Sequence, residues 1–329
     1  MDFRAHLIKA LGLVLMLTLV STAFAQLTPE QQAARDNGLE LYQQHMGVSA
    51  IEPLRIAAEA GDKTAQYYMG ETLRLNNMFM TAEARKWYEA AAEQDDLFSM
   101  LRLSNGGDLC KELGTCASNG PEWREKALRL AYERAEQGDT VAMIALYVAN
   151  QGIGWLEKAA EAGDGFAQQL LAGFYQDGEG WFFLPGSREE AIAKWLKASA
   201  EGGFPVGMMW HAGALYEKGD YAAAFQWRKK AAEAGFINGV FAYAKDLLNV
   251  EGVFDIKPDP IKSYGLFYLI AQLEGGGGSP EYAQWELDEL DKKLSPEQIK
   301  QAEIFAAEWE KTHPPLSYFV PVYGGGRKN

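Results

Sequence analysis

One short phrase recurs along this chain, and each copy ends where a helix would stop. It occurs seven times, as IAAEAGD at 56–62, AAAEQDD at 90–96, ERAEQGD at 133–139, KAAEAGD at 158–164, ASAEGGF at 198–204, KAAEAGF at 230–236 and IAQLEGG at 270–276. The shared glutamates lie 25 to 43 residues apart. Self-similarity at a period of about 20–50 residues indicates stacked units that cannot bury their apolar faces alone. The sequence therefore predicts a repeat array.

Two kinds of residue recur at fixed distances from these glutamates. Large side chains stand six residues before them, with Pro53 as the exception: Trp87, Leu130, Trp155, Trp195, Trp227 and Tyr268. Small ones stand six residues after: Ala65, Ser99, Ala142, Ala167, Gly207 and Gly239. Eleven residues after, the column is again small except for Tyr147: Gly70, Ser104, Tyr147, Ala172, Ala212 and Ala244. Small residues let paired helices approach, and we expect Trp155, Trp195 and Trp227 to be buried between helices.

The phrase also carries the signals that end one helix and start the next. Glycine is favoured just after a helix C-terminus, where the backbone turns left-handed, and Gly61, Gly138 and Gly163 are examples. The aspartate that follows, as in Asp62 or Asp139, can cap the next helix. The predicted fold is all-α: an α/α superhelical solenoid of about seven stacked helix pairs with N- and C-terminal capping helices.

The second helix of the unit carries a family likeness. The segments WYEAAAE at 87–93 and WLEKAAEAG at 155–163 reproduce that helix, and 252–264 reproduces the loop that leads into it. This pattern resembles the Sel-one-like repeat family, a relative of the tetratricopeptide repeat. The resemblance covers about residues 50 to 275 and departs from the family in its irregular spacing and in degenerate units around 96–120. It implies a solenoid that presents a concave face to partner proteins.

The first 25 residues are typical of a cleaved secretory signal peptide. Arg4 and Lys9 precede an apolar run at 10–20, and the triplet Ala23-Phe24-Ala25 gives a cleavage site before Gln26. A membrane anchor is the alternative, but eleven apolar residues rise only about 16 Å as a helix, against a hydrocarbon core of roughly 30 Å. We therefore expect a periplasmic protein with no membrane insertion after signal cleavage.

The remaining segments are interpreted as caps. The pattern Thr28-Pro29-Glu30-Gln31 predicts a capping box at the start of an N-terminal capping helix within 26–49, and Ser295-Pro296-Glu297-Gln298 predicts another. The solenoid is placed at 50–275, the C-terminal capping helices at 276–313 and a tail at 314–329. Two arrangements are open for the tail: it docks back on the solenoid or extends free.

The net charge restricts the classes of partner that the chain can bind, and the two cysteines bear on a disulfide or a metal site. The formal net charge of −14 disfavours nucleic acid and suits a basic protein, although solubility alone would also explain it. The only cysteines, Cys110 and Cys116, are expected to form a disulfide in an oxidising compartment. A zinc site is disfavoured because no histidine lies within thirty residues of either one.

No catalytic motif is present. The sequence lacks H-E-x-x-H, G-x-S-x-G and a P-loop, so no catalytic, cofactor-binding or metal-ligating residue is predicted. His45 and His313 are expected at helix C-termini, where a cation is favourable, and His211 is expected to pack on a helix. Paired carboxylates, as in glycosidases, cannot be tested from sequence alone, because any two acidic residues can meet in space.

One aromatic segment lies outside the repeat pattern. Trp181, Phe182 and Phe183 stand in the segment DGEGWFFLPG at 177–186, where a short polar loop is expected. They either cover the edge of a neighbouring helix pair or form an exposed anchor for a partner.

The function predicted from these features is a periplasmic protein–protein interaction scaffold, not an enzyme. Exported relatives include proteins that look like immunity proteins, so the partner could be a secreted antibacterial toxin or effector, for example a type VI secretion lipase. The alternative is a periplasmic hydrolase or cell-wall-linked enzyme on a repeat scaffold, such as a β-lactam-binding relative. The repeated cysteine pairs of those relatives are missing here.

Overall fold

The computed structural model describes residues 27–104, 119–250, 252–275 and 277–322. Sixteen helices and no named strand occur within these ranges. The helices are α1 (Pro29–Gln43), α2 (Gly47–Glu59), α3 (Lys63–Asn77), α4 (Ala82–Glu93), α5 (Leu97–Ser104), α6 (Gly120–Glu136), α7 (Thr140–Val148), α8 (Gly154–Glu161), α9 (Gly165–Gln176), α10 (Ser187–Glu201), α11 (Pro205–Glu217), α12 (Tyr221–Glu233), α13 (Ile237–Leu248), α14 (Pro260–Ala271), α15 (Ser279–Asp291) and α16 (Pro296–Thr312).

From α1 to α15 each helix packs on the next helix along the chain, and α16 packs on α14. This arrangement confirms the predicted all-α solenoid. The first six phrases end α2, α4, α6, α8, α10 and α12, and the seventh begins in the last turn of α14. Each is thus the end of the second helix of a pair. α1 pairs with α2, and α2 begins at Gly47, so the boundary placed at residue 50 falls inside a helix. None of the helices in the described ranges is long and apolar enough to cross a membrane.

The helix boundaries follow the capping signals of the sequence. Thr28 and Ser295 form the two predicted capping boxes. Asp62 accepts a hydrogen bond from the Ala65 N–H at 2.7 Å, and Asp164 accepts one from the Ala167 N–H at 2.8 Å. The preceding glycines are in the left-handed region, as expected: Gly61, Gly138, Gly163, Gly203 and Gly235. In the second phrase Asp95 takes that conformation instead.

The small columns lie where helices touch. Ala65, Ser99, Ala142 and Ala167 are fully buried, and a Cβ on Gly207 would meet Ser199 Oγ at 2.0 Å. These residues therefore set the closest approach between the second helix of one pair and the first helix of the next. Larger side chains at these points would push the stack apart.

The tryptophan column is less buried than predicted. Trp195 is 9% exposed, but Trp155 and Trp227 are only half-buried, and each has a lysine ammonium over its ring. The next residue is more buried than the column residue in five units, where it is Tyr88, Ala131, Leu156, Leu196 or Leu269. The exception is α12, where Arg228 follows Trp227 and is only half-buried. In most of these helices the side chain that faces the core is thus the one directly after the predicted position. The tryptophan side chain lies at the edge of the core, and a lysine ammonium covers a face of its ring.

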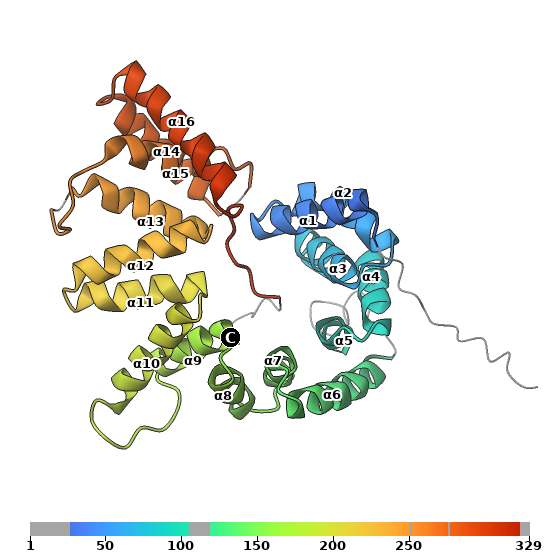
Figure 1. Cartoon of the computed structure of the whole chain (residues 1–329). Coiled ribbons are helices and arrows are strands. Elements are labelled where there is room, and N and C mark those ends of the chain that lie inside the picture. The colour runs from blue at the N-terminus through green and yellow to red at the C-terminus, as the bar shows by residue number, and fades with distance from the viewer. Residues whose placement is uncertain (1–26, 105–118, 251, 276, 323–329) are drawn as a thin grey trace, which may run out of the picture.

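The stack curves into an arc, and the C-terminal segment returns into it. Figure 1 shows the helices following one another from α1 to α16 and the segment after α16 running back toward α1. Phe236 and Ser317 form an isolated parallel bridge, and the Tyr318 N–H donates to the Gln43 carbonyl at 2.9 Å. Of the two arrangements open for the tail, the described residues 314–322 dock.

Candidate interaction site

The loop between α9 and α10 has a defined shape. Its glycines Gly178, Gly180 and Gly186 have φ values of +93°, +80° and +84°, and residues with a Cβ rarely adopt such values. Gly178 ends the turn after α9, and Gly186 is the N-cap of α10. The loop therefore leaves one helix and enters the next through backbone turns that glycine makes possible.

Arg188 holds this loop from its first turn in α10. Its guanidinium donates to the Tyr175 carbonyl at 2.9 Å, to the Glu179 carbonyl at 2.6 Å and to the Gly180 carbonyl at 3.2 Å. The same group lies 4.8 Å from the centre of the Phe182 ring. One cation thus satisfies several loop carbonyls and fixes an aromatic side chain at the same time.

The three aromatic residues of the loop have two different roles. Phe182 is half-buried and packs edge-on against Tyr175, with ring centres 5.0 Å apart. Trp181 and Phe183 are both 90% exposed, and the neighbouring Leu184 is 73% exposed. Phe182 therefore covers a neighbouring helix, while Trp181 and Phe183 project into solvent. A role for them as an anchor for a partner stays a prediction. We call Trp181, Phe183 and Leu184 the loop patch.

The predicted disulfide falls outside the residues that the structure describes. Cys110 and Cys116 both lie in the segment 105–118, so their pairing stays a prediction.

The three histidines beyond the signal segment all have aromatic partners. His45 stacks on Tyr318 with ring centres 4.3 Å apart, and burial lowers the pKa of His45. His211 meets Trp227 edge-on at 5.5 Å, and burial is again the main cause that lowers its pKa. His313 stacks on Trp309 at 3.7 Å. The packed environment expected for His211 is present in the structure.

The most buried charge in the described ranges is Glu71 on α3, whose side chain is 1% exposed. It accepts hydrogen bonds from Arg102 Nε at 2.5 Å, Arg74 Nη2 at 3.1 Å and Tyr88 Oη at 2.7 Å. Burial by itself would raise the pKa of Glu71, but the two guanidinium groups outweigh burial and hold it below its usual value. Each carboxylate oxygen has partners, so the group joins α3, α4 and α5 as a structural ion pair.

Asp246 on α13 has the opposite balance. It pairs with Arg228 Nη1 at 2.7 Å, but its Oδ2 atom has no hydrogen-bond partner among the described residues. Burial outweighs Arg228 and raises the pKa of Asp246 to about 6.

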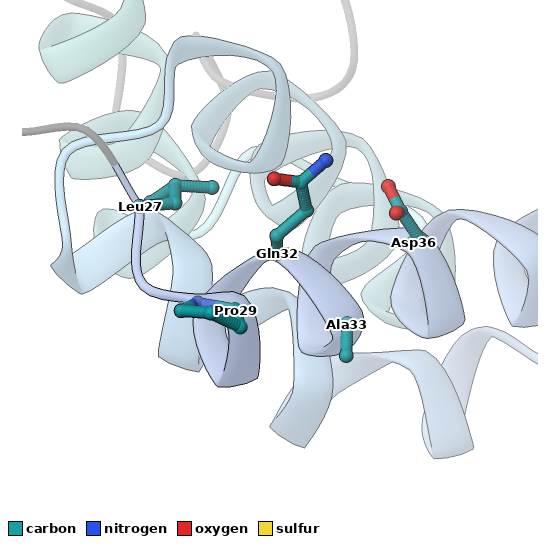
Figure 2. A pocket seen from close by; sticks show the side chains of 5 residues that line it. All are labelled: Leu27, Pro29, Gln32, Ala33 and Asp36. Carbon is teal, nitrogen blue, oxygen red and sulfur yellow. The ribbon is translucent and has the colours of Figure 1, made fainter.

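A hollow of about 660 Å³ lies at the start of α1. Figure 2 shows its lining side chains, which are Leu27, Pro29, Gln32, Ala33 and Asp36. Asp36 is the only ionisable group among them, so the lining offers no acid–base pair. Within the part of the chain that the structure covers, no group of three or more His, Cys, Asp or Glu could hold a metal ion.

The sequence did not reveal the residues that hold the C-terminal segment. Gln43 and Gln44 stand at the end of α1, and Tyr67 lies on α3; all three donate to carbonyls of residues 316–322. Glutamines at a helix end carry no distinctive signal. The apolar run of Tyr318, Phe319 and Val320 is a recognisable signal, because apolar residues in a tail favour docking on the rest of the fold.

No family model matches the chain, and no curated protein matches it. Among solved structures, the chain is similar to c5321, a protective antigen of uropathogenic Escherichia coli that displays an SLR fold, with 19% identity and a TM-score of 0.47. That match covers 87% of this chain and 62% of the antigen, so the chain spans less than two thirds of that protein. A Sel1 repeat protein from Oxalobacter formigenes is 22% identical, with a TM-score of 0.39, over 74% of this chain and 99% of the other.

Proposed function

We propose that this chain is a protein-interaction scaffold that binds a partner protein through the loop patch. The observation that carries the proposal is the 90% exposure of both Trp181 and Phe183 on a loop that Arg188 fixes. Exposed aromatic side chains lose little conformational freedom on binding when their loop is already ordered, and tryptophan is enriched among residues that dominate binding energy. Adjacent apolar side chains in water are otherwise a cost to solubility.

The electrostatic surroundings of the loop patch favour a basic partner. Asp177, Glu179, Glu189 and Glu190 flank it in the sequence and are exposed. The whole chain carries a formal charge of −14. An acidic rim around an apolar centre attracts a positively charged surface and mainly speeds association, so added salt is expected to slow the on-rate more than it changes dissociation.

The compartment and the class of partner are part of the same proposal. The signal segment at 1–25 supports export to the periplasm, where the mature chain would begin at Gln26. In its most specific form, the proposal is an immunity protein that neutralises a secreted antibacterial effector, such as a lipase delivered by type VI secretion. The sequence resemblance, the signal segment and the acidic charge support this form.

The experiment starts with capture from periplasmic extract on the tagged full-length protein, followed by a binding measurement with the purified partner. Trp181→Ala together with Phe183→Ala is expected to weaken binding by about 2 kcal/mol or more, which is about 30-fold in Kd. The matched control is Tyr282→Ala with Trp285→Ala, because these α15 side chains are 68% and 58% exposed. Equal binding by the loop variant and wild type, with loss in the control, would place the interface on α15.

A further inference from the structure

The segment Leu316–Val322 lies across parts of the fold that are far apart in sequence. The Ser317 N–H donates to the Gly235 carbonyl at 2.8 Å, and the Ile237 N–H donates to the Ser317 carbonyl at 3.0 Å. Ile237 is the first residue of α13 and Gly235 lies just before it, whereas the Tyr318 N–H donates to the Gln43 carbonyl at the end of α1. Figure 1 shows this segment inside the arc, between the end of α16 and α1. The segment therefore lies on the inner surface of the solenoid as a non-helical chain that changes direction at Phe319.

The solenoid contacts the segment largely through main-chain atoms. The Gln43 side-chain amide forms a matched pair with Val320: Oε1 accepts from the Val320 N–H at 2.6 Å, and Nε2 donates to the Val320 carbonyl at 3.1 Å. Gln44 Nε2 donates to the Leu316 carbonyl at 3.0 Å, and Tyr67 Oη donates to the Val322 carbonyl. These groups recognise the main chain of a non-helical segment whatever side chains it carries, as main-chain atoms of an added β-strand are recognised.

The side chains of the segment fill apolar places without becoming part of the core. Leu316 and Tyr318 pack on the apolar cluster of the C-terminal helices, Phe319 packs on Phe236, and Val320 packs on the N-terminal cluster. No residue from Leu316 to Val322 is fully buried. Phe319 also has a φ of +52°, a conformation unfavourable for a residue with a Cβ. The segment can therefore leave without opening the helix stack.

We propose that the inner surface formed by the end of α1, Tyr67 and the start of α13 is a binding site for a non-helical peptide with aliphatic and aromatic side chains. The C-terminal segment is its reversible intramolecular occupant, so a peptide of this chemistry binds only when the segment is displaced. This surface is separate from the loop patch, and the inference does not rest on the function proposed for that patch.

The test uses the full-length chain and a labelled synthetic peptide, PPLSYFVPV, which is residues 314–322. Val320→Pro removes the N–H that Gln43 accepts and disfavours the left-handed conformation of Phe319, so it releases the segment while the solenoid side of the site stays intact. Val320→Thr keeps the N–H and a similar shape, and serves as the matched control. Adding Gln43→Ala to Val320→Pro removes the site itself.

Fluorescence anisotropy is expected to show peptide binding at least about ten-fold tighter to Val320→Pro than to wild type or Val320→Thr, with loss in the double variant. Equal binding to wild type and Val320→Pro, or no binding to a folded Val320→Pro chain, would overturn the proposal. Hydrogen exchange of the wild-type chain decides the question if that variant does not fold. The amides of Ser317, Tyr318 and Val320 should exchange at least about ten-fold faster than those of α16. Exchange as slow as in α16 would make the segment a permanent part of the fold.

Discussion

Replacement of Leu196 by alanine tests which helix position faces the core. Leu196 is 1% exposed and lies directly after Trp195, which the sequence pattern had marked as the core position. The change removes three carbon atoms from a closely packed site, which costs about 2.4 kcal/mol of transfer free energy at about 0.8 kcal/mol per buried methylene. The cavity that remains adds to this loss, so we expect about 3–4 kcal/mol of lost stability in total.

The assay is urea unfolding followed by circular dichroism, with the same measurement on Trp155→Ala and Lys197→Ala. Trp155→Ala removes a much larger side chain, so its loss reports on side-chain size as well as direction and is compared only as a second packing site. The exposed Lys197 is the matched control and should change stability by less than about 0.5 kcal/mol. Because a repeat array can unfold in parts, the m-values must match the wild-type value before free energies are compared. A loss below about 1 kcal/mol for Leu196→Ala, or a loss no larger than that of Lys197→Ala, would refute the inferred direction of the core.

Three further changes test other contacts. Gly207→Ala is expected to lower the unfolding free energy by about 2 kcal/mol, because its Cβ would meet Ser199 Oγ at 2.0 Å; an unchanged thermal midpoint would argue against close packing there. The pKa of Asp246 rises from 3.8 to about 6 on folding, so the folded chain binds one more proton between these values. The unfolding free energy of wild type should therefore increase relative to Asp246→Asn by roughly 2.4 kcal/mol as pH falls from 7 to 4, and parallel pH profiles would contradict this. Arg188→Gln should weaken partner binding about ten-fold with little change in stability, because the loop loses its order but keeps its aromatic residues; unchanged binding would show that a fixed loop is not required.

The repeat phrase predicted the helix architecture because its signals are local. A glycine after a helix C-terminus and an aspartate at the next N-cap act within a few residues, so Gly61 and Asp62 could be placed from sequence alone. The small column could be placed too, since only small residues fit between touching helices, and Ala65 is fully buried as a result.

The direction of each helix about its own axis was harder to predict. Trp155 is larger and more apolar than most of its neighbours, so size suggested that it points inward. In the structure Leu156 points inward, and Trp155 lies at the boundary with Lys158 over its ring at 4.1 Å. Tryptophan suits such a boundary because it is rarely fully buried and has a polar N–H group. Hydrophobicity alone does not separate these two positions.

The contacts of the inner surface could not be derived from sequence at all. Gln43 and Val320 are 277 residues apart, and they meet only because the whole arc brings the two ends of the solenoid together. The small rotation between successive helix pairs determines that curvature, and no short motif encodes it. The loop patch was easier to find, since Trp181 and Phe183 interrupt an otherwise regular repeat.

Hydroxyl-radical footprinting of the partner complex tests the central claim most directly. Trp181 and Phe183 are both 90% exposed in the free chain and should react readily with radicals. If the loop patch is the interface, their oxidation should fall at least about five-fold when the partner is bound, as expected for the buried centre of an interface. The oxidation of Tyr282 and Trp285 on α15 should stay unchanged. Unchanged oxidation of Trp181 and Phe183 in a saturated complex would contradict the proposed function.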